Sequence, residues 1–143
     1  MKGIFGRMLA AIGRGLARIF NVGVPLKFVL IALIVFTGGA VAVSGETDLV
    51  TDGKTVAWSH GGSRMMEKIT GCGCSLGGVA AVYACAADPF TAALTATNVY
   101  NLAGRRAEEQ SAGPGSFQVN FLDALYLATP EEIADNPFEL EEA

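Results

Sequence analysis

The longest apolar run of the chain, from Phe28 to Val43, is the feature that most constrains its fold. The run contains no charged residue, and as a helix it would extend about 24 Å at about 1.5 Å per residue. A hydrocarbon core is about 30 Å thick, so this length lies between a signal-peptide core and a membrane anchor. Ala40 and Ala42 at its end form the small-x-small pattern that a signal peptidase accepts. The run therefore predicts either a leader cleaved after Ala42 or a retained single-pass anchor.

Charge is distributed unevenly about this run. Five basic residues and no acid precede it, whereas all fourteen acids follow it with only five basic residues. Such an asymmetry orients a membrane segment with its N-terminus in the cytoplasm. The part of the chain after the run carries a net negative charge, which would repel a phosphate backbone. Nucleic acid is therefore not expected as a partner. The location expected from these patterns is the bacterial inner membrane as a precursor and then the cell surface, or the inner membrane throughout.

Beyond the run, turn and capping signals divide the chain. Asp52-Gly53 predicts a tight turn between two short extended pieces, 48–51 and 55–58. Thr129-Pro130-Glu131-Glu132 predicts a helix start with an N-cap, a first-turn proline and a capping-box glutamate. We expect four segments, namely a leader or anchor (1–42), an exposed polar segment (43–64), a helical hairpin rich in small residues (65–106) and an acidic tail with short helices (107–143). The predicted fold class is all-α.

Small residues recur every four positions in the predicted hairpin. Gly73, Gly77, Ala81 and Cys85 would form a narrow strip on one helix, along which the backbone of a neighbouring helix can approach closely. The strip predicts self-association into a homo-oligomer or filament. Asp88-Pro89 then predicts a turn, because proline removes a helical hydrogen bond and disfavours helix in the residue before it.

The sequence contains few residue patterns that are typical of a catalytic or metal-binding site. His60, the only histidine, is expected in a loop beside two glycines. The Cys72-x-Cys74 pair with a distant Cys85 lacks the paired Cys-x-x-Cys spacing of closed zinc sites. We found no convergent set of nucleophile, base and oxyanion donors. The sequence therefore predicts no enzyme, no metal and no cofactor.

The order of these parts resembles that of an F-type conjugative pilin over residues 40–104. The resemblance is carried by Thr47-Asp48-Leu49, Gly53-Lys54 and Val56, and by the run from Gly78 to Tyr83. It implies a secreted subunit that polymerises into a helical tube accompanied by membrane phospholipid, with a type IV secretion system as partner. The chain departs from that family in its acidic turn, in the polar pair Asn98 and Asn101 and in its long acidic tail.

Two functions follow from this reading. The first is a non-enzymatic structural subunit that self-associates through membrane-derived helices, as a pilin does. The alternative is a single-pass membrane accessory protein that presents an acidic domain outside the inner membrane.

Overall fold

A four-stranded antiparallel sheet forms one layer of the protein. The computed structural model describes residues 38–142. The sheet has the order β1-β2-β3-β4, and its strands are β1 (Val41–Val43), β2 (Asp48–Thr51), β3 (Thr55–Ser59) and β4 (Phe138–Glu142). The last strand thus returns from the far end of the chain to pair with β3, with Ser59 opposite Phe138. The expectation of an all-α fold is wrong, and the protein is a mixed α/β structure.

The β2–β3 hairpin lies where the turn signal predicts it. Asp52 Oδ1 accepts hydrogen bonds of 2.8 Å from the backbone N–H groups of Lys54 and Thr55. Gly53 adopts a φ of 87°, which a residue without a Cβ tolerates best. The segment is nevertheless not an exposed one, because every residue of β2 is buried. The Val, Leu and Thr side chains of these strands suit a sheet that packs against a helix.

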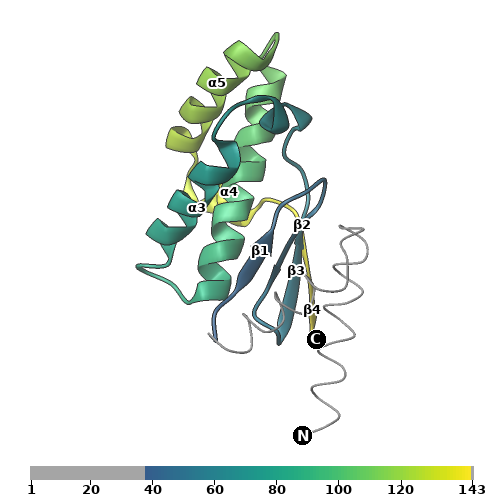
Figure 1. Ribbon diagram of the computed structural model, residues 1–143, viewed down its shortest axis with the longest axis vertical. Helices are drawn as coiled ribbons and strands as arrows, with labels where there is room; N and C mark the ends of the chain where they lie inside the picture. Colours follow the sequence, from purple (N-terminus) through teal and green to yellow (C-terminus); the bar gives the residue numbers. More distant parts are fainter. Residues whose placement is uncertain (1–37, 143) are drawn as a thin grey trace, which may run out of the picture.

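The helical layer is built around one long helix. A 3-10 helix η1 (Arg64–Lys68) is followed by four α-helices, α3 (Cys72–Tyr83), α4 (Pro89–Glu109), α5 (Pro114–Leu127) and α6 (Pro130–Ala134). Figure 1 shows α4 between the sheet on one side and α3 and α5 on the other. The buried residues of α4, from Ala92 to Ala107, therefore face both layers.

Capping explains where the helices begin. Asp88 accepts hydrogen bonds from the N–H groups of Phe90 and Thr91, and Pro89 occupies the first position of α4. Thr129 and Glu132 form the predicted capping box of α6. The helix expected from residue 65 onward is instead interrupted, because Gly71 has a φ of 86° and separates η1 from α3.

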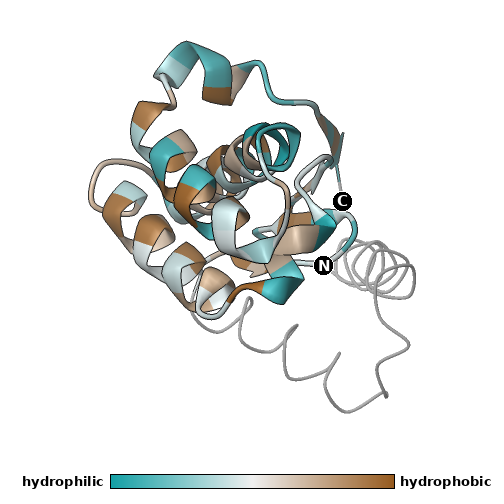
Figure 2. Ribbon diagram, turned by 90° about the horizontal axis from the view of Figure 1, so that it is seen from above, coloured by the Kyte–Doolittle hydropathy of each residue, from teal (hydrophilic) through white to brown (hydrophobic). Residues whose placement is uncertain are grey.

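The core lies where α3, α4 and α5 meet. Tyr100 of α4 packs edge-on against Phe121 of α5 at a centroid distance of 5.2 Å, and Phe117 stacks on Phe121 at 5.8 Å. All three aromatic rings are almost fully buried. Figure 2 shows hydrophobic segments on the outside of the helical layer as well. The side chains of Val119, Leu122 and Tyr126 in α5 are exposed.

The predicted membrane segment is the apolar run 28–43, and the structure describes only its last residues. Residues 28–37 of the apolar run lie outside the described residues. Its end, from Val41 to Val43, is a strand that pairs with β2, with Ala42 opposite Val50. Between residues 38 and 142, no helix combines the length and the apolar character needed to cross a membrane.

Candidate functional site

A cavity of ≈ 820 Å³ opens between the helical layer and the loops at one end of the sheet. One wall is the turn between β1 and β2, at Ser44, Gly45 and Glu46. The opposite wall is the segment that contains Gly61, Gly62 and the residues of η1. Two helices close the cavity, α3 with its first two turns and α4 with its middle and C-terminal end. Their lining residues are Cys72, Gly73, Leu76, Thr97, Tyr100, Asn101 and Glu108.

The N-terminus of α3 carries backbone donors that no side chain caps. Gly71 is the N-cap residue and makes no side-chain cap hydrogen bond. The first N–H groups of an α-helix have no intrahelical acceptor, and the helix dipole makes this end positive. Such an end, preceded by glycine, is a ready binding site for a phosphate or another anion. Because Cys72 and Gly73 line the cavity, this donor set lies at the cavity wall.

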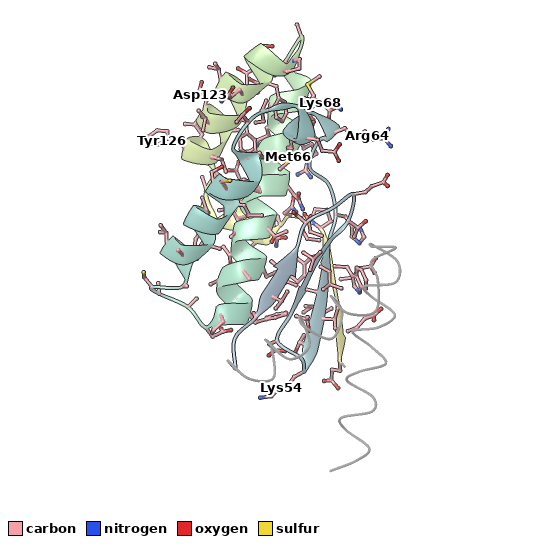
Figure 3. All side chains as sticks on the ribbon, viewed as in Figure 1. Lys54, Arg64, Met66, Lys68, Asp123 and Tyr126 are labelled. Atoms are coloured by element: carbon pink, nitrogen blue, oxygen red, sulfur yellow. The ribbon has the colours of Figure 1, made fainter. Side chains whose placement is uncertain are left out.

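One ion pair joins the two loop walls across the cavity. Arg64 Nη2 lies 3.6 Å from Glu46 Oε1, and these side chains are 91% and 89% exposed. A pair so open to water contributes little stability. Figure 3 shows Arg64 pointing outward from η1, whereas Met66 points in toward the helices.

A buried polar network lies beneath the Gly45 wall. Asp48 is 9% exposed, and its Oδ1 accepts from Gly45 N at 2.9 Å while its Oδ2 accepts from Asn101 Nδ2 at 2.8 Å. Asn101 also donates to Ser59 Oγ at 2.9 Å, and Ser59 donates to Asn98 Oδ1 at 2.7 Å. Burial raises the pKa of Asp48, while the two donated hydrogen bonds and nearby His60 act in the opposite direction. The network ties β2, β3 and α4 together at the cavity.

Two titratable groups near the first turn of α3 are shielded from water. Burial raises the pKa of the Cys72 thiol and, as the largest effect, that of Tyr100. Ser75 is close enough to lower the Tyr100 pKa, but its hydroxyl donates to the carbonyls of Gly71 and Cys72. The buried Tyr100 hydroxyl itself makes no hydrogen bond of normal geometry within residues 38–142.

The predicted self-association strip lies on the surface of α3 and of the turn after it. Gly73, Gly77, Ala81 and Cys85 are not buried. A Cβ built on Gly73 or Gly77 would meet no atom within 4 Å in the described structure. Packing of this strip against a second copy of the chain stays a prediction.

The other predicted site residues lie apart from the cavity. Ala40 and Ala42 lie beside and within β1, so cleavage after Ala42 would divide that strand, and such cleavage stays a prediction. Asp88 and Pro89 form the turn into α4. Within the described part of the chain, no three His, Cys, Asp or Glu side chains are close enough together to hold a metal ion.

Sequence reasoning missed the first turn of α3 and the Asp48 network. The signal for the first was the alternation Gly71-Cys72-Gly73-Cys74, which favours a sharp turn into a helix. The signal for the second was the pair Asn98 and Asn101, three residues apart on one helix face.

Comparison with known proteins identifies the family. The family model described as "HK: Hydroxyethylthiazole kinase family" matches residues 29–131. A hydroxyethylthiazole kinase of Bifidobacterium animalis subsp. lactis is 61% identical over 102 residues, which are 71% of this chain and 34% of the relative. One from Akkermansia muciniphila is 45% identical over 104 residues, 71% of this chain and 38% of the relative. The chain thus spans about a third of the length of the curated relatives it matches.

A solved structure shares the fold. The hydroxyethylthiazole kinase protein from Pyrococcus horikoshii OT3 superposes with a TM-score of 0.74 over 96% of this chain and 53% of that chain, at 24% sequence identity.

These matches overturn the pilin resemblance. The structural-subunit function, the anchored-accessory alternative and the expectation of no enzyme are wrong, because the matching family consists of kinases. The expected inner-membrane and cell-surface location is wrong for the same reason. The matches to pilins were short and of low complexity, and they carried no family information. The chain belongs to the hydroxyethylthiazole kinase family.

Proposed function

We propose that this chain carries the phosphate-binding part of a kinase that transfers a phosphoryl group to hydroxyethylthiazole. The observation that carries the proposal is the uncapped N-terminus of α3 at the wall of the cavity, in a chain of this family. Gly71 with its left-handed backbone sets the turn into the helix. Gly73 has no Cβ that would cover the donors of the first turn.

The chemistry needs such donors. In phosphoryl transfer from a nucleoside triphosphate, the substrate hydroxyl attacks the terminal phosphorus, loses its proton and displaces the nucleoside diphosphate, while charge is spread over the phosphoryl oxygens. Preorganised backbone N–H groups stabilise that charge without reorganising during the reaction. The N–H groups of Cys72, Gly73 and Cys74 point along the axis of α3 toward its N-terminal end, where this charge would lie.

The rest of the cavity suits a small ligand with one apolar part. Its volume of ≈ 820 Å³ falls within the usual range of ligand pockets, about 300 to 1,000 Å³. Met66, Leu76 and Tyr100 supply apolar surface for a heteroaromatic ring. The carboxylates of Glu46, Asp48, Glu67 and Glu108 make the walls polar elsewhere.

A charge placed at the first turn of α3 tests the proposal. Gly73→Asp would put a carboxylate on the phosphate-binding donors, and its Cβ has open space in the described structure. An acid in the first helical turn is favourable for the helix, so the fold should keep its stability. The matched control is Gly77→Asp, one turn further along the same helix face, where the added Cβ also meets nothing.

The measurement is ATP-dependent phosphorylation of hydroxyethylthiazole by the purified full chain, followed by mass spectrometry of the product. The parent protein and Gly77→Asp should form the phosphorylated product, and Gly73→Asp should lose at least about a hundredfold in rate, the effect typical of removing one oxyanion donor. Equal rates for the two variants would refute the role of α3. A parent protein that forms no product would overturn the proposed reaction.

A further inference from the structure

Asp48 lines the cavity between its two loop walls. Its Oδ1 accepts from Gly45 N at 2.9 Å, and Gly45 is an exposed residue of the β1–β2 turn. In the described structure this is the hydrogen bond that links the turn to the buried network. The carboxylate therefore fixes where the Gly45 wall lies.

Asn101 connects the same carboxylate to the opposite wall. Its Nδ2 donates to Asp48 Oδ2 at 2.8 Å. Its Oδ1 faces Gly62, where an added Cβ would lie only 2.8 Å from that oxygen. Asn101 itself is 3% exposed and is held by the rigid helix α4. One buried amide thus binds the carboxylate that accepts from the Gly45 wall and lies next to Gly62 of the other wall.

The orientation of this amide is determined by its neighbours. Asn101 Nδ2 also donates to Ser59 Oγ, whose proton goes to Asn98 Oδ1. A flipped amide would place an oxygen against the Asp48 carboxylate, which only accepts hydrogen bonds when ionised. Because each donor has a buried acceptor, the network holds one arrangement of the walls.

We infer that Asp48 and Asn101 are positioning residues that hold the two loop walls of the cavity at the separation a bound nucleotide needs. This inference rests on the proposed kinase function for its ligand, and on the hydrogen bonds above for its geometry. The residues act through Gly45 and Gly62 and not through the reacting atoms. Removing either side chain should weaken the binding of ATP more than it slows the chemical step.

The variant Asp48→Asn keeps the size of the side chain and removes one acceptor. The new amide could still accept from Gly45 with its oxygen, but only by turning its own nitrogen toward the amide nitrogen of Asn101. Two donors would then face each other in a buried site. The double variant Asp48→Asn with Asn101→Asp restores a donor opposite an acceptor and should recover part of the effect.

The matched control is Asp52→Asn. Asp52 accepts two backbone N–H groups in the same hairpin, at the turn that precedes Thr55. Figure 3 shows Lys54 of that turn at the end of the structure opposite Arg64 and Met66. The same chemical change there leaves both cavity walls untouched.

Two readouts separate positioning from folding. The single oxygen of the new amide avoids the clash of two donors by turning toward Asn101 Nδ2, which leaves the Gly45 N–H without an acceptor. Amide exchange of Gly45, followed by NMR, should therefore become about tenfold faster in Asp48→Asn while the fold persists. The KM for ATP should rise about fivefold or more while kcat stays within about twofold, the pattern of lost uniform binding. Asp52→Asn should change neither quantity, and the double variant should restore both in part.

Each outcome decides the inference. Unchanged Gly45 exchange in Asp48→Asn, or an equal change in Asp52→Asn, overturns it. A fall in kcat with an unchanged KM also overturns it, because the network would then act on the chemical step. If Asp48→Asn fails to fold, Asn101→Ala removes the donor to Asp48 Oδ2 without adding a second buried carboxyl, and it must raise the KM for ATP while kcat stays within about twofold. If the parent protein shows no turnover but the exchange pattern holds, the proposed function fails while the wall-holding role of Asp48 stands.

Discussion

Replacing Gly104 by alanine tests how closely α4 approaches the loop before η1. A Cβ at Gly104 would lie 2.7 Å from Met66 Sδ and 3.3 Å from both Gly62 Cα and Ser63 N. Met66 can move aside because its side chain is flexible, but the two backbone atoms must shift by some tenths of an ångström. Overpacking of this kind costs about 1–3 kcal/mol. Alanine gains up to about 1 kcal/mol over glycine within a helix. We therefore expect a net loss of stability of about 0–2 kcal/mol.

The control for this substitution is Gly78→Ala in α3. Its added Cβ meets nothing within 4 Å in the described structure, so only the helix-propensity gain of up to about 1 kcal/mol remains. The free energy of unfolding, measured by urea denaturation, should therefore differ between the two variants by about 1–3 kcal/mol. Met66→Ala combined with Gly104→Ala should recover more than about 0.5 kcal/mol beyond additivity. Equal stabilisation by Gly104→Ala and Gly78→Ala would refute the close approach.

Two further predictions concern titratable groups. Hydrogen bonds from the Arg106 guanidinium lower the pKa of Glu132 from 4.5 to about 2. Since the folded pKa is the lower one, the pair stabilises the fold above about pH 4.5 and this contribution disappears as the pH falls toward 2. Glu132→Gln should therefore lower the Tm at pH 7, and the difference from the parent protein should vanish near pH 2; a difference that does not depend on pH would contradict this. Cys74 and Cys85 are exposed, whereas Cys72 is buried with a raised thiol pKa. A thiol reagent should modify the first two much faster than Cys72 at about pH 7.5, and three equal rates in the folded protein would refute the burial of Cys72.

Local signals predicted those parts of the fold that depend on neighbouring residues. The Asp52-Gly53 turn and the Thr129 cap are each satisfied by hydrogen bonds to residues within three positions. Such contacts are encoded in a few consecutive residues, so a single sequence is enough to find them. The return of β4 to β3 depends on residues about eighty positions apart. Periodicity does not report such a pairing, and the sheet was missed for that reason.

The candidate site was hidden for a different physical reason. Asn98 and Asn101 looked like polar interruptions of an apolar helix, whereas they supply donors and acceptors to a buried network around the Asp48 carboxylate. The start of α3 lacks the Ser, Thr, Asp or Asn cap that usually announces a helix. Its uncapped donors are the same feature that makes it suited to bind phosphate. A short apolar run does not distinguish a β-strand from the end of a membrane segment, as the strand Val41–Val43 shows.

The central claim is that the first turn of α3 binds the phosphates of a nucleotide, and an NMR titration of the full chain with ATP tests it most directly. The backbone N–H signals of Cys72, Gly73 and Cys74 should shift downfield and saturate, because they gain a charged acceptor. The signals of Gly45 and Gly62 in the cavity walls should follow with the same apparent Kd. The same titration of Gly73→Asp should leave the first-turn signals unmoved. Saturating shifts that spare α3, or identical shifts in Gly73→Asp, would contradict the account.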